Sequence, residues 1–213
     1  MNQKILIIIC LVVANNLWSQ LFTESLKYEE KKISTKGHPK ASGMDIEISY
    51  PSTWEKIEGK RPHVIFNFTS PDKQIRSSFL IKDILEGATE EEKKSLKSID
   101  DVKLNKILSD QFPTSNNCVE SLLEQGYENI KDANCQITKI EGLKTSITSA
   151  HVSASRAGIN LNFYTVMYSF YYKMKLISVS FNFSNVTSSV DRKAAHLLAG
   201  KIMNTVLLND IWK

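Results

Sequence analysis

The sequence lacks the short motifs that mark common catalytic and nucleotide-binding sites. It has no Gly-x-Ser-x-Gly elbow, no P-loop and no glycine-rich dinucleotide fingerprint. None of its histidines is spaced with another histidine, a cysteine or an acid as a zinc site requires. They are His38, His63, His151 and His196. The sequence therefore predicts no cofactor, no metal and no catalytic residue that could be named from spacing alone.

Long apolar runs are also missing. The longest, Ile5 to Ala14, has about ten residues, whereas a membrane-spanning helix takes about 20. It follows Lys4 and precedes the small residue Ser19, which is the pattern of a secretory signal peptide. We expect residues 1–19 to be removed near Ser19, leaving a secreted or periplasmic chain without a transmembrane segment. The alternative, a lipoprotein anchored through Cys10, is disfavoured because an isoleucine precedes that cysteine.

Charge of one sign is not in large excess. The chain has 27 lysines and arginines against 23 acids, a formal charge of +4. The lysines are interleaved with glutamates instead of being gathered in one basic patch. Nucleic acid is therefore not expected as a partner. The expected partner is a protein or a small ligand of unknown identity.

Cysteine is scarce, and only Cys118 and Cys135 remain after the predicted cleavage. An even number of cysteines in an oxidising compartment favours a disulfide. The alternative is a pair of separate buried thiols. We predict a bridge between Cys118 and Cys135.

What the sequence does contain is a strong β-pattern from Lys144 to Phe183. Between Lys175 and Phe183, apolar residues alternate with serine and asparagine at the period of a strand. The stretch from Ile159 to Tyr172 is dense in aromatic and β-branched residues on both alternating faces. These patterns predict consecutive antiparallel strands that are covered on both faces.

Other segments complete an α+β domain over residues 43–213, preceded by a flexible lead-in over 20–42. A strand is predicted at Met44 to Tyr50, and a hairpin turns at residues 70–73. Residues 87–131 are predicted to be a helical insertion that begins with a capping box at Thr89. An amphipathic helix ends the chain. The predicted fold is a central antiparallel sheet of six or seven strands flanked by helices.

The strand from Leu143 to Ser155 is rich in small residues. Small side chains let either a helix or a ligand approach a sheet closely. We expect the C-terminal helix to place its alanines there. The candidate binding surface comprises His151 on this strand together with Tyr164 and Tyr168 on the next. Core packing is the alternative role for both tyrosines.

The stretch Gly43 to Trp54, with the sequence GMDIEISYPSTW, resembles the PsbP-like family, in which an early strand ends in Tyr-Pro near a tryptophan. The resemblance implies an α/β/α sandwich in exported proteins that act mostly as accessory or binding subunits. The helical insertion and the predicted disulfide depart from the family pattern. No functional residue is carried over, and nothing indicates a photosynthetic role.

The leading hypothesis is an exported, non-catalytic accessory or binding protein of a bacterial envelope. The alternatives are an exported hydrolase whose site is assembled only by the fold, and a secreted effector or inhibitor. A concave pocket holding His151 beside an acid or a serine would favour the hydrolase.

Overall fold

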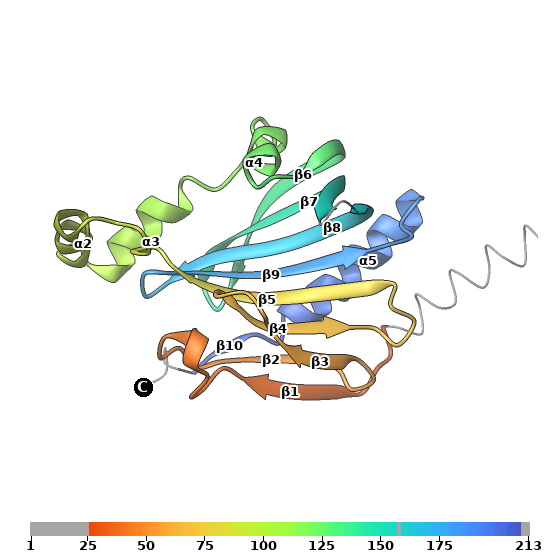
Figure 1. Ribbon diagram of the computed structural model, residues 1–213, viewed down its shortest axis with the longest axis horizontal. Coiled ribbons are helices and arrows are strands. Elements are labelled where there is room, and N and C mark those ends of the chain that lie inside the picture. Colours follow the sequence, from red (N-terminus) through yellow and green to blue (C-terminus); the bar gives the residue numbers. More distant parts are fainter. Residues whose placement is uncertain (1–25, 157–158, 210–213) are drawn as a thin grey trace, which may run out of the picture.

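The computed structural model describes residues 26–156 and 159–209, so the predicted signal peptide and its cleavage near Ser19 lie outside the described residues. Seven strands form the main sheet in the order β3-β4-β5-β9-β8-β7-β6, and every neighbouring pair is antiparallel (Figure 1). The strands are β3 (Glu55–Glu58), β4 (Val64–Thr69), β5 (Ile75–Asp83), β6 (Glu128–Ile140), β7 (Leu143–Arg156), β8 (Ile159–Tyr172) and β9 (Lys175–Phe183). The predicted central antiparallel sheet is confirmed.

The alternating residues of β9 form the centre of the core, as the sequence pattern predicts. Phe181 lies opposite Val166 of β8 and Ser77 of β5, and Val179 lies opposite Phe79. Phe181, Val166, Val179 and Phe79 are at most 1% exposed. Side chains of neighbouring strands therefore stack in register on one face, which is the usual unit of sheet stabilisation.

Helix α5 (Ser189–Met203) and a second, three-stranded sheet cover this face of the main sheet. Ser188 caps α5 through a capping box with Asp191. The buried side of the helix includes Leu198 and Met203, which belong to the same core as β8 and β9. The opposite face of the main sheet carries α3 (Asp101–Ser109) and α4 (Cys118–Glu124). Helices thus lie on both sides of the sheet.

The three-stranded sheet corrects the prediction of a flexible lead-in over residues 20–42 for the described part, residues 26–42, whereas residues 20–25 lie outside the described residues. Within it, β1 (Glu30–Ser34) pairs along β2 (Ile46–Pro51), and β10 (Leu207–Leu208) pairs on the other side of β2. A short 3-10 helix, η1 (Pro39–Ala41), follows β1. The charged sequence of β1 hides its strand character, because its partner strand supplies nearly all of the buried side chains.

The helical insertion is confirmed at its start and corrected at its end. Helix α2 (Glu90–Lys97) begins with the predicted capping box at Thr89. An ion pair joins Glu90 to Lys93 within this helix. The insertion stops at α4, because β6 already begins at Glu128. The predicted bridge is present: the sulfur atoms of Cys118 and Cys135 lie at bonding distance and join α4 to β6.

A helix does cover the small residues of β7, but it is not the predicted one. Ala150 and Val152 pack against Leu122 of α4, whereas α5 packs mainly on β8, β9 and β2. Successive residues of a strand point to opposite faces. The small side chains at 146, 148 and 150 therefore lie under the insertion, on the far side of the sheet from α5. Within the described residues, no helix has the length and apolar character needed to cross a membrane.

Candidate functional site

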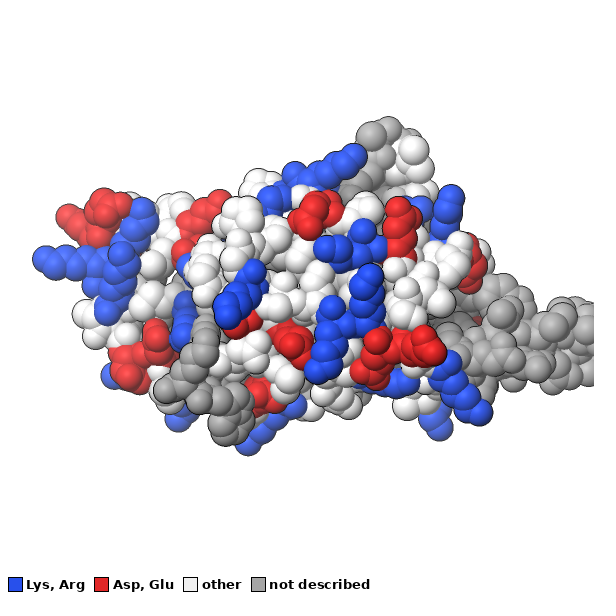
Figure 2. Space-filling view, turned by 90° about the horizontal axis from the view of Figure 1, so that it is seen from below, with Lys and Arg blue, Asp and Glu red and all other residues white. Residues whose placement is uncertain are grey.

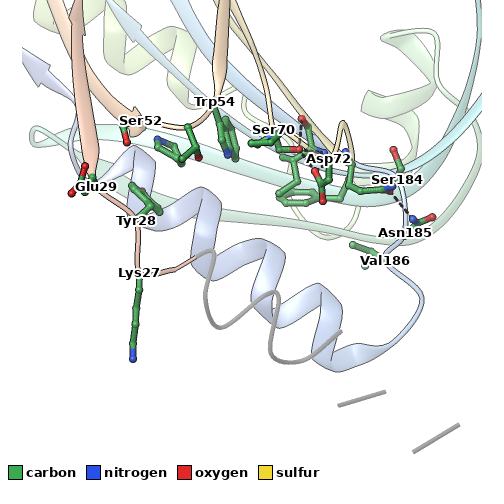
Figure 3. A pocket seen from close by; sticks show the side chains of 16 residues that line it. Lys27, Tyr28, Glu29, Ser52, Trp54, Ser70, Asp72, Ser184, Asn185 and Val186 are labelled. Atoms are coloured by element: carbon green, nitrogen blue, oxygen red, sulfur yellow. Dashed lines mark hydrogen bonds between the residues drawn. The ribbon is translucent and has the colours of Figure 1, made fainter. Parts of the chain in front are cut away.

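One end of the molecule is hollowed by a cavity of about 690 Å³. Four segments that are distant in sequence surround it: residues 27–29 before β1, the turn at 51–54, the turn at 70–75, and residues 183–186 at the end of β9 (Figure 3). Its apolar walls include Trp54, Phe183 and Val186, which are all at least nine-tenths buried. The volume and the aromatic lining are those of a site for a small organic molecule.

Three charged residues line the cavity, namely Lys27, Glu29 and Asp72. Figure 3 shows the side chains of Lys27 and Glu29 pointing away from the other labelled side chains. Asp72 accepts hydrogen bonds from the Ser70 hydroxyl and, at 3.1 Å, from the Gln74 backbone N–H. These two bonds fix the turn between β4 and β5. The walls therefore favour a ligand that is mainly apolar and uncharged.

Lys201 of α5 holds the N-terminal wall in place. Its ammonium group lies 3.9 Å from the centre of the Tyr28 ring and donates a 2.6 Å hydrogen bond to the Leu26 carbonyl oxygen. Burial, with a smaller effect of Glu30, raises the pKa of Tyr28 to about 12. The Tyr28 hydroxyl thus stays protonated at physiological pH. The Ser52 N–H also donates to the Glu29 carbonyl oxygen, at 2.8 Å.

The opposite wall, residues 184–186, is held from two sides. Gln74 accepts hydrogen bonds from the Ser184 N–H at 2.9 Å and from the Asn185 side-chain amide at 2.6 Å. The carbonyl oxygen of Val186 accepts a 2.8 Å hydrogen bond from Nε2 of His151. Both anchors come from the main sheet or its turns, so the cavity is largely formed before any ligand arrives.

The structure brings His151 and Tyr164 of the predicted binding surface together under α5, whereas Tyr168 lies further along β8, with its hydroxyl near Gly200. Tyr164 and Tyr168 are 3% and 6% exposed, so their phenol rings fill the core instead of lining an open groove. The Tyr164 hydroxyl and Nε2 of His196 share a 3.0 Å hydrogen bond, and burial lowers the pKa of His196. The ring of His151 packs 4.8 Å from that of Tyr164. Of these residues, only His151 contacts the cavity wall, through its hydrogen bond to the carbonyl oxygen of Val186.

The arrangement of His151 does not meet the condition set for a hydrolase. Its Nδ1 lies 3.2 Å from Asp132, but Nε2 is engaged with Val186 and no nitrogen is left for a nucleophile. His151 is also not among the residues that line the cavity. No group of three or more metal-binding side chains occurs in the described part of the chain.

Neither a protein-family model nor a curated protein sequence matches the chain. Among solved structures, it is similar to cyanobacterial PsbP (CyanoP) from Synechocystis sp. PCC 6803, with 14% identity, a TM-score of 0.48 and coverage of 84% of this chain and 92% of that one. It is also similar to LpqN of Mycobacterium tuberculosis, described as involved in cell envelope biogenesis, with 9% identity, a TM-score of 0.40 and coverage of 84% and 91%. A crystal structure from Bacteroides thetaiotaomicron shares 12% identity at a TM-score of 0.39, over 76% of this chain and 44% of that one. The predicted PsbP-like resemblance is thus found at the level of the fold, and it identifies no ligand or partner.

Sequence reasoning missed most of the cavity, because its walls come from turns and strand ends. Trp54, which ends the stretch that resembles the PsbP-like family, lies at the cavity. Pro51 and Pro71 marked the two turns without indicating that these turns meet.

Figure 2 shows acidic and basic side chains intermingled on the face seen from below, without a large region of one sign.

Proposed function

We propose that the protein is an exported, non-catalytic binding protein of a bacterial envelope, and that the cavity at the end of its main sheet takes a small, mainly apolar, uncharged ligand. The cavity carries the proposal: it has a ligand-sized volume, an aromatic lining and walls anchored by hydrogen bonds. The signal-like N-terminus and the Cys118–Cys135 bridge support export.

A fluorescent probe tests the cavity without knowledge of the natural ligand. N-phenyl-1-naphthylamine is neutral and apolar, and it becomes bright in apolar surroundings. We expect saturable binding of about one probe per chain. Ser52 is exposed and lines the cavity, so Ser52→Trp should fill the space without disturbing the core and weaken binding by about tenfold or more.

Ser115 provides the matched control, because it is also an exposed serine but lies outside the cavity lining. Ser115→Trp should bind the probe like the unaltered protein. Equal affinities of the two tryptophan variants would show that the probe binds elsewhere, and the proposal would then fail. Export is tested separately, by fractionation and by the N-terminal sequence of the processed chain.

A further inference from the structure

The wall of the cavity at Val186, just after β9, is tied to a histidine on β7, two strands away in the main sheet. Val186 is 7% exposed, and its carbonyl oxygen accepts from Nε2 of His151 on β7 at 2.8 Å. Nδ1 of the same ring lies 3.2 Å from Oδ2 of Asp132 on β6. A single imidazole thus connects the cavity wall to an acid on the edge strand of the main sheet.

Both partners of this imidazole are hydrogen-bond acceptors. Carbonyl and carboxylate oxygens cannot donate, so the two contacts are satisfied together only when both ring nitrogens carry a proton. A neutral ring has one N–H, and its other nitrogen then points a lone pair at an oxygen. The carboxylate of Asp132 is the stronger acceptor, because charge-assisted hydrogen bonds are about twice as strong as neutral ones. The contact that a neutral ring gives up is therefore the one to Val186.

The charged and titratable groups around the imidazole come from three elements. Arg192 of α5 donates to the same oxygen of Asp132 at 3.0 Å, so this carboxylate is shared by two donors. Lys131 of β6 lies opposite the histidine in the strand register. On β8, burial raises the pKa of Tyr164, and its hydroxyl meets His196 of α5, whose pKa burial lowers. Both shifts favour the neutral form of the group.

We propose that His151 acts as a proton-operated latch, meaning that the doubly protonated imidazole holds the cavity wall through its bond to Val186. The protein then binds its ligand more tightly when the imidazole is doubly protonated. This inference rests on the proposed function. Histidine is the side chain that ordinarily changes charge between about pH 5 and 8. Losing the bond to Val186 leaves that wall to be ordered by the ligand, which costs affinity. By linkage, ligand binding promotes proton uptake by the same factor.

Probe affinity at pH 6 and pH 8 tests the latch. In the unaltered protein, the affinity for N-phenyl-1-naphthylamine should fall by about fivefold or more between pH 6 and pH 8. His151→Gln should remove this dependence. Asp132→Asn should keep the pH 6 affinity at pH 8, because without the carboxylate the single proton of the neutral ring stays on Nε2. Residue 132 has φ +53°, a conformation that asparagine tolerates.

His63→Gln is the matched control, since His63 also faces an acid, Glu86 at 3.1 Å, but lies outside the cavity lining. This variant should keep the pH dependence of the unaltered protein. Saturable binding with equal affinity at both pH values, or an unchanged dependence in His151→Gln, overturns the latch and leaves the proposed function standing. Absence of saturable binding at both pH values overturns the proposed function itself, and the latch with it.

A second measurement needs no variant. Thr187 contributes the amide N–H of the peptide bond that contains the Val186 carbonyl group, so its amide resonance reports on the bond from His151. Its N–H also donates to Asp191 at 3.2 Å. Burial raises the pKa of Asp191, but hydrogen bonds from residues 188 and 187 together lower it by more, so the net pKa is lowered and this carboxylate stays ionised above pH 6. The Thr187 resonance should shift between pH 6 and 8. A resonance that does not move over this range contradicts the latch.

Discussion

The docking of α5 on the main sheet is tested by two neighbouring leucines. Leu198 is fully buried in the main core, whereas Leu197 is 52% exposed. Leu198→Ala removes buried methyl groups and leaves a cavity, which costs about 3 kcal/mol of unfolding free energy. With a urea dependence of roughly 2 kcal/mol per molar, the unfolding midpoint should fall by about 1.5 M.

Leu197→Ala is the control, because it makes the same chemical change one residue away on the solvent side. Its midpoint should stay within about 0.3 M of the unaltered protein, since surface substitutions usually change stability by less than about 0.5 kcal/mol. Urea titrations followed by far-UV circular dichroism give both values. Equal losses for the two variants, or a larger loss for Leu197→Ala, would show that α5 does not pack on the sheet as described.

Three further predictions concern the scaffold. Changing both bridged cysteines to alanine should lower the unfolding free energy by about 3 kcal/mol, because the bridge closes a loop with a sequence separation of 17; chemical denaturation with an unchanged midpoint would contradict this. Gly59→Ala should cost about 2–3 kcal/mol, because a Cβ there would lie 2.1 Å from the carbonyl oxygen of Val64; a variant with unaltered melting temperature would be evidence against this packing. Burial lowers the pKa of His196 in the folded state, so the unfolded chain takes up a proton first as the pH falls. The unfolding free energy should therefore decrease as the pH drops below about 6.5. In His196→Gln, the urea midpoints at pH 5 and pH 7 should differ less than in the unaltered protein.

Elements with a buried face could be predicted from the sequence because burial leaves a periodic pattern. The alternation of β9 and the apolar stripe of the C-terminal helix identified both elements, and together they form the centre of the main core. The hairpin at residues 70–73 was equally clear, because proline and aspartate specify its turn. In each case the deciding forces act within a few residues of the chain.

Elements whose stability comes from a distant partner could not be predicted in this way. The strand β1 is charged and mostly exposed, and only its pairing with β2 makes it a strand. The strand β3 has no buried residue and was missed for the same reason. The sequence also could not decide which helix covers Ala150, because both faces of β7 carry small side chains. The cavity belongs to this class, since four distant segments form it.

The binding role of the cavity is tested most directly by the indole N–H resonance of Trp54, which is assigned as the signal that is absent in Trp54→Phe. Ring currents act over short distances, so only a probe in the cavity should move this resonance strongly. During titration with N-phenyl-1-naphthylamine, we expect the Trp54 signal to shift and to saturate at about one equivalent, and the shift should be absent in Ser52→Trp. Probe fluorescence that saturates while the Trp54 resonance stays in place would contradict a ligand site at this end of the sheet.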